Sequence, residues 1–274
     1  MKREELTKAQ RWAVADRLAD ERLPKINASL DDVHPRTNLY SKVGKRVIDI
    51  VVSSAALIVT FPINLVIGVL TYLDVGSPLF FKQIRTGKGG RPFEIVKFRN
   101  MRIEYDKNGD LLPPDQRVTK LGKFVRKTSL DELLNFWSVF KGDMSIIGPR
   151  PLVPEYSHRY NKQHVMRLSV RPGLECPPQA LDDKVWTWQE QLDNDVWYVE
   201  NISLRTDCRM IINLFRFALD RKSANARALS KRGTFMGYSL DGIAINLDQV
   251  EQRYIDDAES IGQDFTQIES SNDK

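Results

Sequence analysis

The stretch IVVSSAALIVTFPINLVIGVLTYL, residues 50–73, decides the fold class because it runs for 24 residues without a charged side chain. About 20 apolar residues are enough for a helix to cross a bilayer. Asp49 and Asp74 bound the stretch, and Pro62 lies near its middle, where proline removes a backbone hydrogen bond and bends a helix. A start near residue 50, with no small-residue cleavage site following, excludes a cleavable signal peptide.

Basic residues flank this stretch at both ends: Lys42, Lys45 and Arg46 before it, and Lys82, Arg85, Lys88 and Arg91 after it. By the positive-inside rule, both ends favour the cytoplasm. A straight span would place one cluster outside, whereas a helix broken at Pro62 that enters and leaves by the same face would keep both inside. The residues alone leave these two arrangements open, and the length and the flanks disfavour a third, a buried core helix.

The composition bounds the remaining functions. The chain has 274 residues and a formal net charge of +5, but residues 241–274 carry nine acidic and two basic side chains, so the body is strongly basic and the tail acidic. A basic body indicates a polyanionic partner: nucleic acid, anionic lipid or a phosphorylated substrate. The two cysteines, Cys176 and Cys208, form no CxxC motif, and the three histidines lack metal-ligand spacing, which excludes a cysteine-rich metal site.

The rest of the chain predicts an α+β, mostly helical fold with a small β element. Extended runs at 79–85 and 93–99 surround a glycine-rich turn, which indicates a hairpin. Helices are expected over 4–23 (ended by Pro24 and followed by a linker over 24–41), 117–127, 130–141, 152–163, 186–200 and 203–221. We divide the chain into an N-terminal helix and linker (1–41), a membrane helix (42–75), a catalytic domain (76–222) and a C-terminal extension with an acidic tail (223–274).

The segment SLDELLNFWSVFKGDMSIIGPRP, residues 129–151, places two adjacent carboxylates, Asp131 and Glu132, among several cations. A structural interpretation comes first. Ser129 and Glu132 form the sequence pattern of a capping box, and acidic residues in a first turn complement the helix dipole. The pattern GxxxxGK[ST] of a phosphate loop is absent, as are GxGxxG, HExxH and GxSxG, so nucleotide binding, if present, is not of the P-loop or Rossmann type.

Several segments in order then resemble one family, the bacterial sugar transferases, which are monotopic polyprenyl-phosphate phosphoglycosyl transferases. The resemblance covers roughly residues 42–222 and rests on KRVIDI (45–50), FPINLVIG (61–68), FKQIRTGKGGRPFEIVKFRNMR (81–102), GDLLPPDQRVTKLGKFVRKTSLDELLNFWSVFKGDMSIIGPRPL (109–152) and VRPG (170–173). It implies a re-entrant helix broken at Pro62 and anchored in the inner leaflet of the bacterial cytoplasmic membrane. The catalytic domain would face the cytoplasm.

The resemblance also implies a reaction and the residues that perform it. A sugar phosphate passes from a nucleotide diphosphate sugar, expected to be UDP-linked, to polyprenyl (undecaprenyl) phosphate, which starts capsule, exopolysaccharide or glycoprotein glycan assembly. Asp131 would be the nucleophile that forms a covalent phosphosugar intermediate. Glu132, with Asp131, would hold Mg²⁺.

Further site residues follow from the matching motifs. Those expected to bind substrate phosphates are Lys97, Arg126, Arg150 and Arg171. Gln179 and Asp195 are expected to contact substrate. One departure from the family lies at residues 174–184, LECPPQALDDK, where members commonly carry a segment like ITGLAQVNGR. Its two prolines stiffen the loop, so we expect it to influence the choice of sugar donor.

Two alternatives compete with the transferase. A nucleic-acid-binding protein fits the basic charge, but no nucleic-acid-binding motif occurs and the apolar stretch would be unexplained. A membrane-anchored scaffold or regulator of polysaccharide assembly without transferase activity fits the anchor, yet not the clustered acidic and basic motifs. We therefore expect no nucleic acid partner, and the sequence leaves a homodimer, the sugar and the pathway open.

Overall fold

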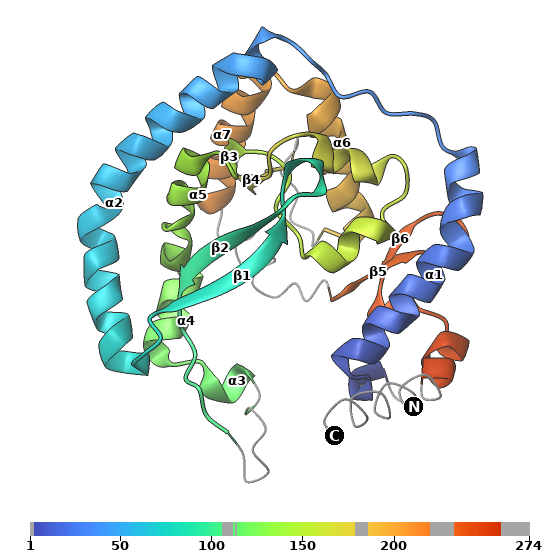
Figure 1. Ribbon diagram of the computed structural model, residues 1–274, viewed down its shortest axis with the longest axis horizontal. Coiled ribbons are helices and arrows are strands. Elements are labelled where there is room, and N and C mark those ends of the chain that lie inside the picture. Colours follow the sequence, from blue (N-terminus) through green and yellow to red (C-terminus); the bar gives the residue numbers. More distant parts are fainter. Residues whose placement is uncertain (1–2, 106–111, 113, 179–185, 220–232, 259–274) are drawn as a thin grey trace, which may run out of the picture.

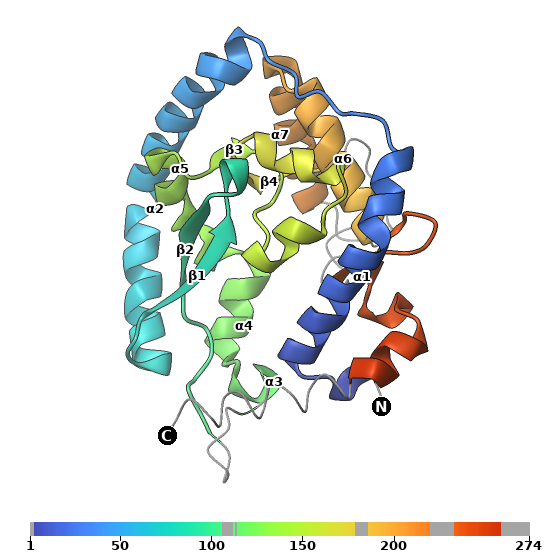
Figure 2. The same cartoon turned by 45° about the vertical axis from the view of Figure 1, so that its right-hand side comes forward.

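The computed structural model describes residues 3–105, 112, 114–178, 186–219 and 233–258. Within these ranges the protein is mostly helical with small two-stranded sheets, as predicted. The α-helices are α1 (Lys8–Ser29), α2 (Lys45–Val75), α3 (Pro114–Arg117), α4 (Lys120–Lys127), α5 (Asn135–Lys141), α6 (Trp188–Asn201) and α7 (Leu204–Leu219). The strands are β1 (Phe80–Thr86), β2 (Pro92–Phe98), β3 (Ser145–Ile147), β4 (Gly173–Glu175), β5 (Phe235–Tyr238) and β6 (Ala244–Asn246). Figures 1 and 2 show α2 and α1 on opposite sides of the molecule, with the β1–β2 hairpin between them.

Helix α1 begins at a capping box formed by Thr7 and Gln10 and continues through Pro24 to Ser29. The prediction that Pro24 ends this helix, with a linker from residue 24, is therefore wrong. A proline in a helix interior costs about 3 kcal/mol. Here Pro24 is exposed, whereas Ile26 beyond it is buried in an aromatic cluster, and we attribute the continuation of the helix to that packing.

Helix α2 carries the apolar stretch and follows a π-helical turn at Tyr40–Gly44. It is continuous through Pro62, so the predicted break at this residue is not observed. Figure 1 shows α2 as a long bowed helix along one side of the molecule. The hydroxyls of Ser53 and Ser54 both donate to the carbonyl of Ile50 one turn earlier, and such side-chain bonds are a known way to bend a helix without ending it.

Polar contacts fix the first two turns of α2 to the rest of the protein. Arg46 donates to the carbonyl oxygens of Val139 (2.7 Å) and Phe140 (2.7 Å), which lie in α5. Asp49 Oδ1 accepts from Ser145 Oγ at 2.9 Å and from the Ile146 amide at 3.0 Å. The start of the apolar helix is therefore held against the domain that follows it.

Strands β1 and β2 form the predicted antiparallel hairpin, in which Phe80 pairs with Phe98 and Thr86 with Pro92. Strands β3 and β4, which the sequence did not reveal, pair in parallel. They approach so closely at Gly148 and Gly173 that a Cβ atom on Gly173 would lie 2.1 Å from the Gly148 amide nitrogen. Glycine is required there because no side chain fits.

The segments that follow β3 differ from the prediction in one place. The helix expected over 152–163 is absent, and two 3-10 segments, η5 (Pro154–Arg159) and η6 (His164–Ser169), lie in this region. Tyr160 between them has an extended backbone, with φ of −75° and ψ of 139°, which interrupts any continuous helix. The predicted helices at 186–200 and 203–221 are confirmed as α6 and as α7, which is described as far as Leu219.

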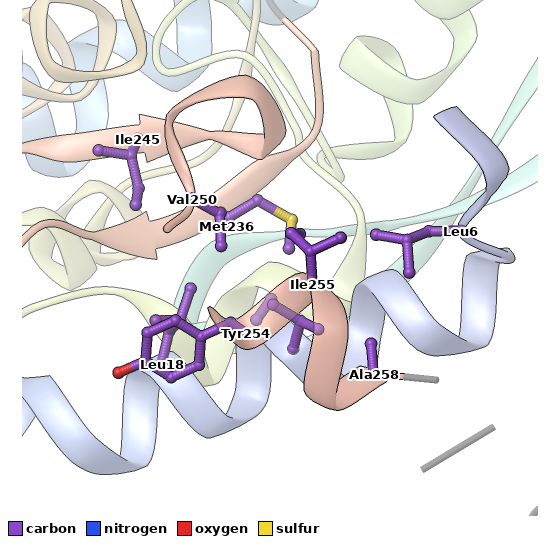
Figure 3. Close-up of a cluster of buried hydrophobic side chains, with 10 residues drawn as sticks. Leu6, Leu18, Met236, Ile245, Val250, Tyr254, Ile255 and Ala258 are labelled. Atoms are coloured by element: carbon purple, nitrogen blue, oxygen red, sulfur yellow. The ribbon is translucent and has the colours of Figure 1, made fainter. Parts of the chain in front are cut away.

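The two ends of the chain pack together, although they are separate regions in the sequence. Strands β5 and β6 and a helix over 252–258 cover α1, and their apolar side chains form one buried cluster, labelled in Figure 3. The Arg22 guanidinium of α1 donates to the carbonyl of Tyr238 at 2.6 Å and to Glu251 at 2.6 Å. The acidic tail after residue 258 lies outside the described residues.

Candidate active site

Asp131 and Glu132 lie in a 3-10 turn, η4 (Leu130–Glu132), between α4 and α5. Ser129 before them has a left-handed backbone, with φ of 55°, and its side chain makes no cap. The predicted capping box is therefore wrong. The single helix expected over 130–141 is also wrong, because α5 starts only at Asn135. A left-handed residue ends a helix and redirects the chain, so both carboxylates project from a turn.

Glu132 is held between two cations that come from different parts of the chain. Lys97 Nζ, on β2, lies 2.7 Å from Glu132 Oε1, and Arg150 Nη2 lies 2.8 Å from the same oxygen. Arg150 Nη1 in turn donates to Glu175 Oε2, on β4, at 2.9 Å. The hairpin, the loop after β3 and β4 therefore converge on one carboxylate.

The two carboxylates have different charge environments. Burial raises the pKa of the Asp131 carboxyl, and the neighbouring Glu132 charge raises it as well, while Lys97 opposes this effect. Burial also raises the pKa of Glu132, but Arg150 and Lys97 outweigh it and hold this pKa below its usual value. Glu132 is therefore a stable carboxylate, whereas Asp131 is the carboxylate whose charge is less well compensated. Perturbed carboxyls beside cations in a pocket are typical of functional sites.

A pocket of about 1050 Å³ opens over Asp131 and Glu132. It is lined by residues of β1 and β2, by the segment after β2, by Arg117 and Arg126 of α3 and α4, and by Ser129 and η4. Four of the residues predicted from the sequence line this pocket: Lys97, Arg126, Asp131 and Glu132. Arg150 does not line it but reaches Glu132 from the loop behind it.

The other predicted site residues lie elsewhere. Arg171 lines a different pocket, and its Nε donates to the Gly142 carbonyl at 2.9 Å. Asp195 is buried in an ion pair with Arg167, at 2.8 Å, and does not line the Asp131 pocket. Gln179 lies outside the described residues, as does the second half of the loop expected to influence donor choice. Substrate contact by these residues stays a prediction.

Three residues that the sequence analysis did not place in the site take part in its geometry. Glu175 binds Arg150, as described above. Arg167 donates to the Arg150 carbonyl at 2.7 Å through Nη2, the same atom that lies 2.8 Å from Asp195. Asp195 is thus linked to the backbone of Arg150 through Arg167. No signal in the sequence joins these residues: Arg167 belongs to no motif that we singled out, and Glu175 lies in the 174–184 loop, which we considered only for donor choice.

Arg85 is the third of these residues. It lies on β1, on the same face of the hairpin as Lys97, because Phe81 pairs with Lys97 and alternate residues share a face. Its Nη2 donates to Gln83 at 2.7 Å, while its Nε is buried without a partner. Burial and the nearby Arg150 guanidinium lower the pKa of Arg85. A guanidinium with an unused donor can bind an anion. Arg85 does not itself line the Asp131 pocket.

The donor set suits a magnesium ion. Mg²⁺ commonly binds one or two carboxylates together with substrate phosphates. In the described ranges no group of three or more His, Cys, Asp and Glu side chains could hold a metal. A magnesium ion here would therefore need phosphate oxygens to complete its shell. Both cations contact Glu132 through Oε1, so Oε2 and the Asp131 carboxylate are the oxygens that fit this role.

A second, apolar groove of about 730 Å³ lies between α2, the hairpin and α5. Its walls are almost entirely apolar and include Phe61 and Leu65 from α2 and Trp137 from α5. Leu79, Phe80 and Phe98 line both this groove and the Asp131 pocket. The apolar groove and the Asp131 pocket are therefore adjacent.

The helical segment Tyr40–Val75 is long and apolar enough to cross a membrane. Only 11% of its most apolar window is buried against the rest of the protein, which contradicts a core helix. Large apolar side chains such as Ile58, Val59 and Leu73 are exposed along it. A contiguous apolar surface of this kind is typical of a membrane contact.

Comparison with known proteins matches the region that contains α2 and the Asp131 pocket. A family model described as bacterial sugar transferase matches residues 40–221. The uncharacterized sugar transferase EpsL of Bacillus subtilis is 40% identical over 167 residues, which cover 61% of this chain and 83% of EpsL.

Two further relatives carry a named activity. A UDP-glucose:undecaprenyl-phosphate glucose-1-phosphate transferase of Klebsiella pneumoniae is 35% identical over 184 residues, covering 64% of this chain and 40% of the relative. A UDP-N-acetylgalactosamine-undecaprenyl-phosphate N-acetylgalactosaminephosphotransferase of Aeromonas hydrophila is 34% identical over 183 residues, covering 64% and 43%. The chain thus spans less than half the length of these two relatives. The first 39 residues and those after 221 lie outside the family match.

Proposed function

This chain belongs to the bacterial sugar transferase family, and from that premise we propose that it transfers a sugar phosphate from a UDP-linked sugar to undecaprenyl phosphate. Nucleoside monophosphate is the other product, and the lipid-linked sugar starts a surface polysaccharide or glycan. The observation that carries this proposal is the Asp131 carboxylate, which lines a pocket with Glu132, Lys97 and Arg126. Related transferases named for this reaction support the choice of substrates.

In the proposed mechanism, an Asp131 oxygen attacks the phosphorus that carries the sugar. A bond forms between this oxygen and phosphorus, the bond to the nucleotide phosphate oxygen breaks, and the nucleoside monophosphate leaves with that electron pair. A phosphate oxygen of undecaprenyl phosphate then attacks the same phosphorus and restores the Asp131 carboxylate. Covalent catalysis of this kind divides one transfer into two steps.

The surrounding residues position the donor and compensate its charge. Phosphoryl transfer depends mostly on positioning and on neutralising negative charge. Lys97 and Arg126 line the pocket, as do Lys82, Arg99 and Arg117. We assign the contacts with a bound diphosphate to Lys97 and Arg126, which fall inside the matching motifs, while Arg150 holds Glu132 in place. Asp131 and Glu132 would hold the magnesium ion that we propose as cofactor, which when bound supplies further positive charge to the phosphates.

The apolar groove supports a polyprenyl acceptor. It shares Leu79, Phe80 and Phe98 with the Asp131 pocket. We propose that a lipid in the groove places its phosphate at the carboxylates of that pocket. Both cationic flanks of α2 favour the cytoplasm, and we infer that the apolar surface of the helix lies in the inner leaflet with both ends on the cytoplasmic side. The bow of α2 is compatible with this re-entrant placement.

A radiolabel assay tests the reaction. The full chain in detergent or nanodiscs is mixed with undecaprenyl phosphate and each of a panel of labelled UDP-sugars. We expect transfer of label into an organic-extractable lipid with at least one donor, loss of transfer on adding EDTA, and recovery with excess Mg²⁺. Failure with every donor, in a preparation that is folded, would favour the scaffold alternative.

Topology is tested separately. In a Cys208→Ser background, in which the remaining native Cys176 is buried, one exposed cysteine replaces Lys25 or Lys120. Both lysines are exposed and lie on opposite sides of α2 in the sequence. Re-entrant placement predicts that a membrane-impermeant maleimide labels neither in intact cells and both after permeabilisation. Labelling of one alone in intact cells would show a straight span. Pro62→Ala should move part of the population toward the straight span.

A further inference from the structure

A second cationic pocket lies at the start of α2, apart from the Asp131 pocket. It measures about 290 Å³, and none of its lining residues lines the Asp131 pocket. Five cationic side chains line it: Arg36, Lys42, Lys45, Lys88 and Arg171. Asp49 is the carboxylate among the lining residues.

Three of the five cations make no ion pair with any residue in the described ranges: Arg36, Lys42 and Lys88. The other two are engaged. Lys45 pairs with Asp207, and Arg171 donates through Nε to a backbone carbonyl, which still leaves its terminal guanidinium nitrogens. The negative charge of Asp49 is partly compensated within the protein, because Ser145 and the Ile146 amide both donate to its Oδ1. The pocket therefore carries an excess of positive charge.

Arg36, Lys42 and Lys88 come from distant parts of the sequence. Arg36 lies in the segment before α2, Lys42 in the π-helical turn, and Lys88 at the tip of the hairpin. Residues 35–37 line the pocket but precede the family match at residue 40, so this wall is contributed by a segment outside the matched region. A concave site that gathers like charges from separate elements attracts an anion.

The position of this pocket indicates which anion it meets. Leu39 and Val43 lie among the lining residues in sequence and are 79% and 55% exposed. They begin the apolar surface that continues along α2, so the pocket is next to the part of the chain where, in the proposed placement, this surface enters a bilayer. The anions concentrated at that depth are the phosphates of acidic phospholipids.

We propose that this pocket binds the phosphate of an anionic phospholipid headgroup, with the acyl chains lying along Leu39, Val43 and the start of α2. The site would fix the depth and the orientation of the helix at the membrane surface. This inference rests on the membrane placement of α2, but not on the sugar transfer reaction. It can therefore fail while the transferase activity holds, and the reverse.

The test measures lipid binding, not activity. The full chain in neutral detergent is titrated with dihexanoyl-phosphatidylglycerol, dihexanoyl-phosphatidylcholine or inorganic phosphate, and the shift in melting temperature gives an apparent affinity for each. We expect the anionic lipid to bind roughly tenfold or more tightly than phosphatidylcholine, because each cation near a membrane surface adds attraction for acidic lipid.

Two triple variants with the same change in charge separate a built site from general electrostatics. Arg36→Gln/Lys42→Gln/Lys88→Gln should lose most of the preference for the anionic lipid. The control, Lys25→Gln/Lys120→Gln/Lys123→Gln, removes three exposed cations from α1 and α4 and should keep it. Lys88→Gln alone should give an intermediate loss and guards against misfolding of the triple variant.

Three results would overturn the proposal. The first is equal binding of the anionic and the zwitterionic lipid to the wild type. The second is equal loss of preference in the two triple variants, which would indicate a net-charge effect. The third is competition by inorganic phosphate at concentrations similar to those of the lipid, which would assign the pocket to a free phosphate instead of a headgroup.

Discussion

Two acid–base clusters in this protein have similar chemistry and opposite surroundings. In the first, Glu132 contacts Lys97 and Arg150, and the side chains of Glu132 and Arg150 are 28% and 43% exposed. In the second, Asp195 and Arg167 are paired at 2.8 Å with side chains 1% and 2% exposed. One cluster lies next to a pocket, and the other lies in the interior.

The difference in burial determines whether the ion pairs of each cluster can be broken at low cost. An ion pair near the surface is worth about 0–1 kcal/mol, so an incoming phosphate can compete for its cations at little cost. A buried pair that loses one partner leaves an unpaired charge in the interior, which costs about 3–5 kcal/mol. The first cluster can therefore exchange partners during a reaction, whereas the second holds the structure.

The largest expected effect is the loss of turnover on substitution of Asp131, in the pocket next to the exposed cluster. We expect Asp131→Asn to lower turnover by about 10³-fold or more, because an amide cannot serve as the nucleophile. Stability should stay the same or rise, since burial raises the pKa of this carboxyl and the folded protein thus disfavours its charge. The measurements are labelled-lipid formation and the melting temperature. Substantial turnover, without deamidation of the new side chain, would remove Asp131 from the mechanism.

The second prediction concerns the buried pair. Asp195→Asn should destabilise the protein by about 3–5 kcal/mol, because Arg167 is left buried without its counter-charge. The melting temperature should fall by roughly 10 °C. Turnover per folded molecule, measured well below that temperature, should fall far less than in Asp131→Asn.

A double variant tests the physical reason. Asp195→Leu/Arg167→Met replaces both charges by apolar side chains and should recover much of the lost stability, as buried pairs often tolerate such replacement. It also removes the bond from Arg167 to the Arg150 carbonyl. If Asp195→Asn left the melting temperature unchanged but abolished turnover, Asp195 would be a substrate residue, as the sequence suggested, and not a structural one.

The sequence predicted the residues of the exposed cluster better than those of the buried pair. Lys97, Arg126, Asp131 and Glu132 fall inside matching motifs, and the structure brings them to one pocket. Motifs record residue identity but not burial. For that reason the sequence could not show that Asp195 lies in the interior with Arg167, or that Arg171 lines a different pocket.

The fold was predictable where a local pattern decides it. The β1–β2 hairpin, α6 and α7 follow from alternation, turn residues and helical periodicity. Long-range packing decides the rest. Pro24 does not end α1 because Ile26 is buried after it, and Ser129 does not cap a helix because its backbone is left-handed. The packing of β5 and β6 on α1 joins residues more than 200 positions apart, which no local pattern encodes.

The third prediction weakens the exposed cluster without removing its charge. In Arg150→Lys a single ammonium replaces the fork that contacts Glu132 and Glu175 together, so it cannot keep both contacts. We expect the KM for the sugar donor to rise by about tenfold with kcat less affected, and the stability to change by less than about 1 kcal/mol. A loss of stability as large as that of Asp195→Asn would show that the two clusters do not differ as proposed.

The smallest expected effect is at Arg85, where we expect a substitution to weaken donor binding without lowering the stability of the protein. Burial and the adjacent Arg150 guanidinium lower the pKa of Arg85, so its charge is unfavourable until an anion binds. Arg85→Gln should therefore leave stability unchanged or slightly higher while the donor KM rises by roughly three- to tenfold, as expected for one lost charge-assisted hydrogen bond. Arg85→Lys keeps the charge, so its KM should lie between those of the wild type and Arg85→Gln. The control is Arg91→Gln, which removes an exposed arginine of the same hairpin and should change neither the KM nor the stability. Melting curves and steady-state kinetics on the four proteins decide the matter. A lower melting temperature with an unchanged KM would mean that Arg85 supports the hairpin and does not contact the donor.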